Sequence, residues 1–398
     1  MAPRTILYTG KGGVGKTSVA AATARRAAGS GRRTLLMSTD PAHSLGDVLE
    51  AELYHEPTQV DELLWAREIS ARDELERHWA AVRRWLSEAL VSGGVDRISA
   101  EELTVPPGMD ELFSLLALRD HHDSGEFDVI VVDCAPTGET LRLLSFPEVA
   151  RWWLDKVFPQ QGRLLDAARP LARAVLDVTL PGDEVFEDVR RLVANLVAMN
   201  ELLRDREHVS LRLVTTADRM VVDEARRTFT YLNLYGFLTD AVVVNRLFSA
   251  DAGAYFGSWR ERQLQQLEEI AAAFAPVPVL QAPYFEREVV GAEMLDRLAE
   301  ALFAGRDPAD RLHDEVSEEL ELTGEDAAVL RLRLPLADRG EVGLKRVGAD
   351  LVVSVGRMRR TIHLPAALRD LRPADAAFED GTLTITLTRE TVEATDDR

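Results

Sequence analysis

Cysteine is almost absent from this chain, since Cys134 is the only one among 398 residues. A single thiol excludes an internal disulfide and any thiolate metal cluster within one chain. Long apolar runs are absent too, and none reaches the roughly 18 residues that a membrane-spanning helix requires. The first residues lead straight into a strand-like segment, without a charged and then apolar leader. We therefore expect a cytoplasmic protein with no direct membrane insertion.

Lysine is also scarce. Among the 47 basic residues the lysines are Lys11, Lys16, Lys156 and Lys345. The net charge is −20, and most of it falls on residues 1–322, because residues 323–398 are nearly balanced. A surface this acidic repels nucleic acid and anionic lipid at long range, so we expect no nucleic-acid partner. The length and the 46% hydrophobic content predict a large core and two domains.

Two of the lysines lie in one glycine-rich segment, residues 10–17, which reads GKGGVGKT. It fits the pattern G-x-x-x-x-G-K-[ST], in which backbone amides surround phosphates and the hydroxyl binds Mg²⁺. A strand-like run precedes it and an Ala-rich helical run follows, so the loop opens onto a helix N-terminus that favours anions. A flexible glycine turn is the alternative. The segment predicts nucleotide binding by Gly12, Gly13, Val14, Gly15, Lys16, Thr17 and Ser18, with Lys11 as an additional compact cation that suits a phosphate oxygen.

Strand-like runs alternate with longer helical stretches through the first three quarters of the chain. The runs are residues 5–9, 34–38, 127–133, 211–215, 241–244 and 277–281. This alternation predicts an α/β fold with a mostly parallel sheet flanked by helices. In such sheets ligands bind at the carboxyl ends of the strands.

The residues after the second and third runs are candidates for chemistry. Asp40 follows the second run and could orient a water that attacks the γ phosphate, whereas a turn-capping aspartate is the alternative. His43 reads as a loop residue. Asp133 ends the apolar run 129–132, which is the arrangement that places a carboxylate near Mg²⁺ or its waters.

The ends of the last two runs could form a base pocket. Asn245 carries an amide that both donates and accepts, which suits adenine. Pro283 and Tyr284 offer flat apolar faces. An ordinary loop is the alternative at each position.

The segments GKGGVGKTS (10–18), DPAHSLGD (40–47) and DCAPTGETLRLLSFP (133–147) together resemble the deviant Walker A, switch I and switch II motifs of the ArsA-related ATPases. This family includes arsenite-pump ATPases and the ATPase that delivers tail-anchored membrane proteins. The resemblance covers about residues 4–303. It implies the P-loop fold, ATP and Mg²⁺ as ligands, and a homodimer.

The resemblance also implies a role for each matching residue. Lys16 would contact the β and γ phosphates, Thr17 and Asp133 would hold magnesium, and Asp40 would position the attacking water. Asn245 would lie near adenine. Lys11 would reach the nucleotide of the partner subunit, where it would neutralise transition-state charge only in a closed dimer.

Three departures from the family pattern bear on function. Switch II has Cys134 and Glu139 where the family pattern has threonine and histidine. The Cys-x-x-Cys pair that binds zinc between subunits of the tail-anchor ATPase is missing. The cysteines of an arsenite site are missing as well, and a soft metalloid needs soft thiolates.

Residues 147–206 correspond to the helical insertion that binds clients in the family. Apolar residues recur there at helical spacing, which fits either a hydrophobic client groove or ordinary core. Methionine, which adaptable grooves favour, is scarce in the segment.

After an acidic linker at 305–322, apolar residues recur at every second position. The alternating runs are residues 329–334, 343–347, 350–355, 360–364 and 382–387, which predict a small β-sandwich at 323–390. The segments RTIHLP (360–365) and AFEDGTL (377–383) resemble the α-crystallin domain of small heat-shock proteins, with Gly381 in a tight turn. Residues 391–398 read as a loose acidic tail. His363, His121 and His122 lack partners at metal-ligand spacing and read as structural or surface residues.

The sequence therefore predicts a homodimeric, Mg²⁺-dependent ATPase of residues 1–304 with an appended α-crystallin-like domain. By resemblance, hydrolysis would serve protein targeting or the chaperoning of a hydrophobic protein client. A nucleotide-gated holdase with incidental turnover is the first alternative. An ATPase for arsenite or anion export is the second.

Overall fold

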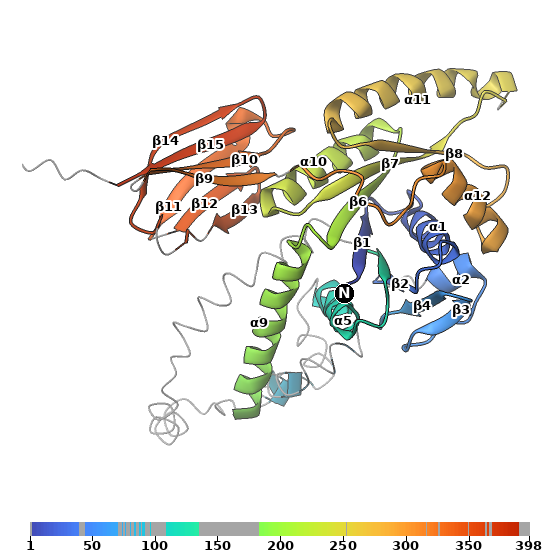
Figure 1. Cartoon of the computed structure of the whole chain (residues 1–398), viewed down its shortest axis with the longest axis horizontal. Helices are drawn as coiled ribbons and strands as arrows, with labels where there is room; N and C mark the ends of the chain where they lie inside the picture. Colours follow the sequence, from blue (N-terminus) through green and yellow to red (C-terminus); the bar gives the residue numbers. More distant parts are fainter. Residues whose placement is uncertain are drawn as a thin grey trace, which may run out of the picture.

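The computed structural model describes residues 2–39, 44–70, 109–134 and 183–389, except residues 252, 316, 325–326, 349, 363 and 366–367, together with scattered positions between 74 and 96. Figure 1 shows a central sheet with helices around it and a separate group of strands beside one end of α10. The expectations for Asp40, His43, Glu139 and His363, for most of the insertion at 147–206 and for the tail at 391–398 fall outside the described residues.

The central sheet has eight strands in the order β3-β4-β2-β5-β1-β6-β7-β8. The strands are β1 (Arg4–Thr9), β2 (Thr34–Ser38), β3 (Thr58–Asp61), β4 (Leu64–Glu68), β5 (Val129–Asp133), β6 (Val209–Thr216), β7 (Thr239–Leu247) and β8 (Val279–Pro283). Every pairing is parallel except β3 with β4. The mostly parallel sheet is therefore confirmed, and β3 and β4 are an edge hairpin that the sequence did not indicate.

Helices cover both faces of this sheet. They are α1 (Lys16–Gly29), α2 (Leu45–Leu49), α5 (Met109–Ser124), α9 (Asp183–Leu203), α10 (Arg219–Tyr235), α11 (Gly253–Phe274) and α12 (Gly291–Phe303). Side chains alternate between two buried clusters, as β1 shows: Ile6 and Tyr8 belong to the cluster with α1 and α12, and Leu7 to the cluster with α9 and α10. No helix among the described residues is both long enough and apolar enough to cross a membrane.

The C-terminal strands form two antiparallel sheets, in the orders β14-β15-β10-β9 and β11-β12-β13. The strands are β9 (Glu318–Gly324), β10 (Ala327–Arg333), β11 (Val342–Val347), β12 (Asp350–Val355), β13 (Met358–Ile362), β14 (Arg372–Glu379) and β15 (Thr382–Thr388). Ala328, Leu330 and Leu332 alternate inward along β10 and are fully or almost fully buried. The predicted β-sandwich is confirmed, and we call it the sandwich below.

Two details of the sandwich differ from the sequence expectation. The linker predicted at 305–322 is wrong for residues 318–322, which lie in β9 and pair with β10. The acidic composition of this segment concealed the alternation of Glu319 and Glu321 with Leu320 and Leu322. Strand β14 was not anticipated either. Gly381 lies in the turn between β14 and β15 with φ 69°, and a Cβ there would come within 2.7 Å of the Pro335 Cα.

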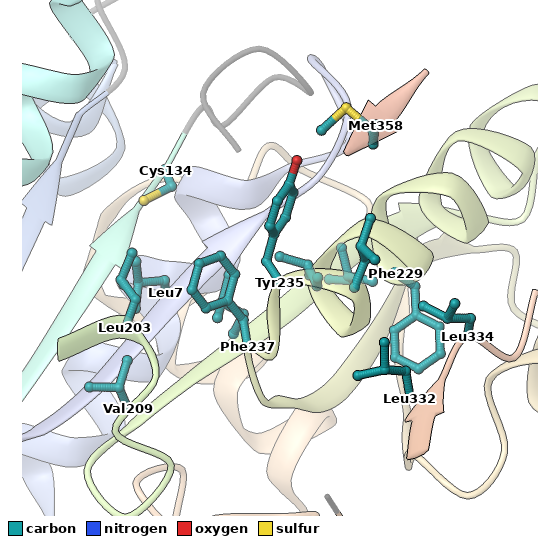
Figure 2. Packing of buried hydrophobic residues seen from close by; sticks show 14 of the residues in the cluster. Leu7, Cys134, Leu203, Val209, Phe229, Tyr235, Phe237, Leu332, Leu334 and Met358 are labelled. Carbon is teal, nitrogen blue, oxygen red and sulfur yellow. The ribbon is translucent and has the colours of Figure 1, made fainter. Parts of the chain in front are cut away.

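The sandwich packs against the C-terminal end of α10. One buried cluster runs from Leu7 and Phe237 in the sheet unit, through Tyr235, to Leu334 and Met358 in the sandwich (Figure 2). The connection is polar as well as apolar. Arg360 of β13 is 3% exposed, donates to the Leu234 carbonyl at 2.7 Å, and lies 2.7 Å from the Glu318 carboxylate. We call this set of contacts the junction.

Candidate functional site

The loop between β1 and α1 depends on two glycines that approach neighbouring chain closely. A Cβ on Gly10 would lie 2.1 Å from the Val214 carbonyl oxygen of β6. A Cβ on Gly15, where φ is 92°, would lie 2.4 Å from the Asn245 Nδ2 atom of β7. Glycine is the residue that tolerates such positions, so the loop lies directly over the ends of both strands.

The start of α1 is built to receive an anion. Its N-cap, Gly15, makes no side-chain capping bond, and the first turn holds no acidic residue, so the amides there remain available. A Cβ on Gly12 or Gly13 would meet nothing within 4 Å, so there is open space above the loop. Lys16 is 6% exposed, and its Nζ donates to the Lys11 carbonyl at 3.3 Å.

The two residues predicted to hold a metal ion lie together. The Thr17 Oγ1 atom donates to the Asp133 Oδ2 atom at 2.6 Å, and Asp133 is fully buried at the end of β5. The Ser44 Oγ atom lies 3.4 Å from the Thr17 Oγ1 atom. Hydroxyl and carboxylate oxygens are the donors that Mg²⁺ prefers, so these residues fit that ion and would hold it. Ser44 was missed, although its place in the segment after β2 is the signal that could have found it.

The predicted base-pocket residues also meet. Asn245 donates from Nδ2 to the Val14 carbonyl at 2.9 Å and accepts on Oδ1 from the Arg246 amide at 2.9 Å. A cavity of about 500 Å³ is lined by Gly15, Ser18, Asn245, Arg246, Pro283 and Tyr284, among others. Asn245 thus ties the end of β7 to the phosphate loop.

Gln263 braces the loop after β7, and sequence reasoning missed it. Its side-chain amide donates to the Arg246 carbonyl at 3.1 Å and accepts from the Phe248 amide at 2.8 Å. Arg246 has φ 61°, a left-handed conformation that is uncommon for a residue with a side chain. The brace from α11 therefore holds one wall of the cavity in shape.

Lys11 turns away from the phosphate loop. Its Nζ atom lies 3.3 Å from the Glu224 Oε2 atom of α10, and both side chains are 41% exposed. The two lysines of the loop thus have different partners.

Cys134 and the two neighbouring histidines serve packing. Burial raises the pKa of the Cys134 thiol to about 12, so the thiol stays protonated. The His121 Nε2 atom accepts from the Arg67 guanidinium at 2.7 Å, and burial followed by the Arg67 charge lowers the pKa of His121. His122 shares a hydrogen bond of 3.1 Å with the Thr5 hydroxyl, and burial lowers its pKa as well.

The family relationship follows from sequence profiles. The profile of the anion-transporting ATPases matches residues 3–304. The chain belongs to this ArsA family of ATPases. A second profile, for the HSP20-like domain found in ArsA, matches residues 325–387. The suspected family and its appended α-crystallin-like domain are both confirmed, and with them the P-loop fold and the hydrolysis of ATP.

Several relatives match over most of their length. A putative arsenical pump-driving ATPase of Prosthecochloris vibrioformis is 37% identical over 95% of this chain and 94% of its own. One from Aquifex aeolicus is 34% identical over 94% of this chain and 98% of its own. The ATPase get3 of Aspergillus terreus is 30% identical over 75% of this chain and 90% of its own. The relatives of this ArsA-family ATPase thus carry two kinds of name, arsenical pump-driving ATPase and ATPase get3.

Proposed function

We propose that this ArsA-family ATPase is a Mg²⁺-dependent homodimer that couples ATP hydrolysis to a conformational change, in the targeting or chaperoning of hydrophobic protein clients. The observation that carries the proposal is the divergence of the two loop lysines. Lys16 is 6% exposed and faces its own loop, whereas the Lys11 side chain is 41% exposed and lies against α10. A cation that is paired with an exposed carboxylate can change partner at small cost, so it can serve a second chain.

The residues divide the work of an in-line displacement. Lys16 and the loop amides would hold the β and γ phosphates, and Thr17, which donates to Asp133, would hold the metal together with it. Mg²⁺, when bound, neutralises charge on the phosphate oxygens. Asp40 orients a water whose oxygen bonds to the γ phosphorus while the bond to the β–γ bridging oxygen breaks, releasing ADP and phosphate. The partner's Lys11 adds positive charge to that transition state in the closed dimer.

The burial of the single thiol favours protein clients over metalloids. Cys134 is buried and its pKa is raised, so it does not offer the thiolates that trivalent arsenic requires. The relatives named as arsenical pump ATPases keep anion export as the second candidate. Turnover that rises with arsenite or antimonite, and not with hydrophobic peptide segments, would favour export.

Complementation between two inactive variants tests the shared active site. Lys11→Ala and Asp40→Asn should each lose most ATPase activity as homodimers. In a mixed dimer, one site combines the intact Asp40 of the first variant with the intact Lys11 of the second. Random mixing should then restore about a quarter of wild-type turnover if Lys11 acts in trans.

The control is Lys345→Ala, which removes an exposed lysine of β11 in the sandwich and should leave turnover unchanged. Absence of recovery in the mixture, with both variants folded and able to bind ATP, would show that Lys11 acts within its own chain.

A further inference from the structure

The short helix α2 begins beside the residues that fit a metal ion. Its N-cap residue, Ser44, has its Oγ atom 3.4 Å from the Thr17 Oγ1 atom. Ser44 makes no side-chain capping bond to α2, so the helix that follows does not use its hydroxyl. The next residue, Leu45, is fully buried. The start of α2 therefore has one side chain in the core and one at the site.

Glu68, the last residue of β4, supplies the cap that Ser44 does not. Its Oε1 atom accepts from the backbone amides of Leu45 and Gly46, each at 3.0 Å. Amides in the first turn of a helix have no partner within it, and a carboxylate is favoured at this positive end. Figure 1 shows α2 beside β4. A side chain of the sheet thus holds the start of α2.

Glu68 is itself fixed by the central sheet. Strand β4 pairs with β2 so that Glu68 lies opposite Ser38, and the Ile69 amide donates to the Ser38 carbonyl at 3.0 Å. The residue after Ser38, Thr39, donates from its amide to the Asp133 carbonyl at 3.0 Å. The backbone of Glu68 is therefore tied to the strand end that carries Asp133.

These contacts close a circuit around the proposed metal site. The circuit runs from Asp133 through the ends of β2 and β4 to Glu68, and from there to the start of α2. It returns through Ser44 to Thr17, which donates to Asp133 at 2.6 Å. In this circuit the bonds that Glu68 accepts are the step from the sheet to α2.

The other end of α2 is held separately. Glu50 ends the helix with φ 52° and lies against the start of α12, where a Cβ on Gly291 would come within 2.4 Å of the Glu50 Oε2 atom. Val48 lines the base-pocket cavity of about 500 Å³. Loss of the Glu68 carboxylate should therefore loosen the Ser44 end of α2 and leave the base-pocket end in place.

We infer that Glu68 is a positioning residue for ATP hydrolysis, which acts through α2 to hold Ser44 beside Thr17. The inference rests on the role proposed above for Thr17 and Asp133 in holding Mg²⁺. A small displacement at the reacting centre lowers the rate of a reaction steeply. Glu68 should therefore matter more for the rate of hydrolysis than for the binding of ATP.

Steady-state kinetics of the full chain test this split. Glu68→Ala removes the acceptor and should lower kcat at least about tenfold, while KM for ATP changes by less than about threefold. Glu68→Gln keeps an amide oxygen that can accept from the same two backbone amides, and should restore kcat to within about threefold of wild type. The matched control is Glu62→Ala, which removes an exposed carboxylate in the turn before β4 and should change neither constant.

Hydrogen exchange without nucleotide tests the positioning independently of the metal. In Glu68→Ala the amides of Leu45 and Gly46 lose their acceptor and should exchange at least about tenfold faster, whereas Glu68→Gln should protect them. Exchange in α10 should stay as in wild type, which shows that the variant is folded.

The outcomes separate the inference from the proposal beneath it. Unchanged exchange at the start of α2 in Glu68→Ala overturns the positioning role. A kcat as low in Glu68→Gln as in Glu68→Ala, with the two amides still protected, also overturns it, because the charge rather than the cap would then matter. Wild-type turnover that needs no divalent cation overturns the metal site instead.

Discussion

The two ends of α10 are held in different ways. At the nucleotide edge of the sheet, Glu224 meets Lys11 in an exposed ion pair. At the junction, Tyr235 is 2% exposed and Arg360 3%, and the contacts are buried. Exposed ion pairs contribute about 0–1 kcal/mol, whereas removing one partner of a buried pair costs about 3–5 kcal/mol.

The end of α10 near Lys11 is therefore adjustable, and the end at the junction is fixed. Contacts at the nucleotide edge can be exchanged at small cost, which suits residues that must change partner during turnover. Contacts at the junction resist exchange, so the sandwich and α10 should move as one piece. Substitutions at the two ends should therefore affect different properties.

The largest effect is expected at the junction. Arg360→Leu leaves the Glu318 carboxylate and the Leu234 carbonyl without their partner, and should lower the free energy of unfolding by about 3 kcal/mol. Urea titration followed by circular dichroism measures the loss. Arg331→Leu is the matched control, because its ion pairs with Glu319 and Glu321 lie on the sandwich surface. Equal unfolding curves for the two variants would mean that the junction is as loose as the surface.

A smaller effect is expected from the thiol at the end of β5, which belongs to the buried cluster that continues into the junction. Because burial raises the pKa of Cys134 from 9 to about 12, the thiolate fraction at pH 8 is about 1,000-fold lower in the folded chain than in urea, and labelling by a disulfide reagent should be at least about 100-fold slower. The unfolded thiol ionises near pH 9, so the buried neutral thiol costs no stability below that pH and lowers stability above it. Since the chain has one cysteine, the labelling rate reports this site alone. Equally fast labelling in both states would show that the end of β5 opens to water.

The smallest effect is expected at the nucleotide edge. Glu224→Gln removes one charge of an exposed pair and should change the free energy of unfolding by less than about 1 kcal/mol. The half-saturating ATP concentration should change by less than about twofold, since the released Lys11 needs little energy to leave its partner. Steady-state kinetics and urea titration measure both. A tenfold loss of turnover would instead place Glu224 in the chemistry.

Strands with a continuous apolar run or a clear alternation of apolar and polar residues could be predicted from sequence, whereas β3, β4, β9 and β14 could not. Strands β1, β2 and β5 are apolar runs because both faces of the sheet are covered. The edge strand β3 alternates between half-buried and exposed residues, so it carries little apolar signal. In β9 the glutamates concealed the period of two, and Pro373 weakened the pattern of β14.

In the site, too, only the features that a local sequence pattern carries could be predicted. Thr17 and Asp133 could be placed together because the carboxyl ends of parallel strands share one edge. The bond from Asn245 to the Val14 carbonyl joins residues 231 positions apart, and no local pattern announces it. The brace from Gln263 depends on where α11 lies over β7, which packing decides.

The Asn245 amide joins the end of β7 to the phosphate loop that follows β1, although β6 lies between β1 and β7 in the sheet. The shape of the phosphate loop is thereby tied to the spacing of strand ends across the sheet. Any twist of the sheet shifts the loop amides relative to the wall of the base pocket. The affinity for ATP therefore depends on the geometry of the sheet, through the hydrogen bond that the Val14 carbonyl accepts from Asn245.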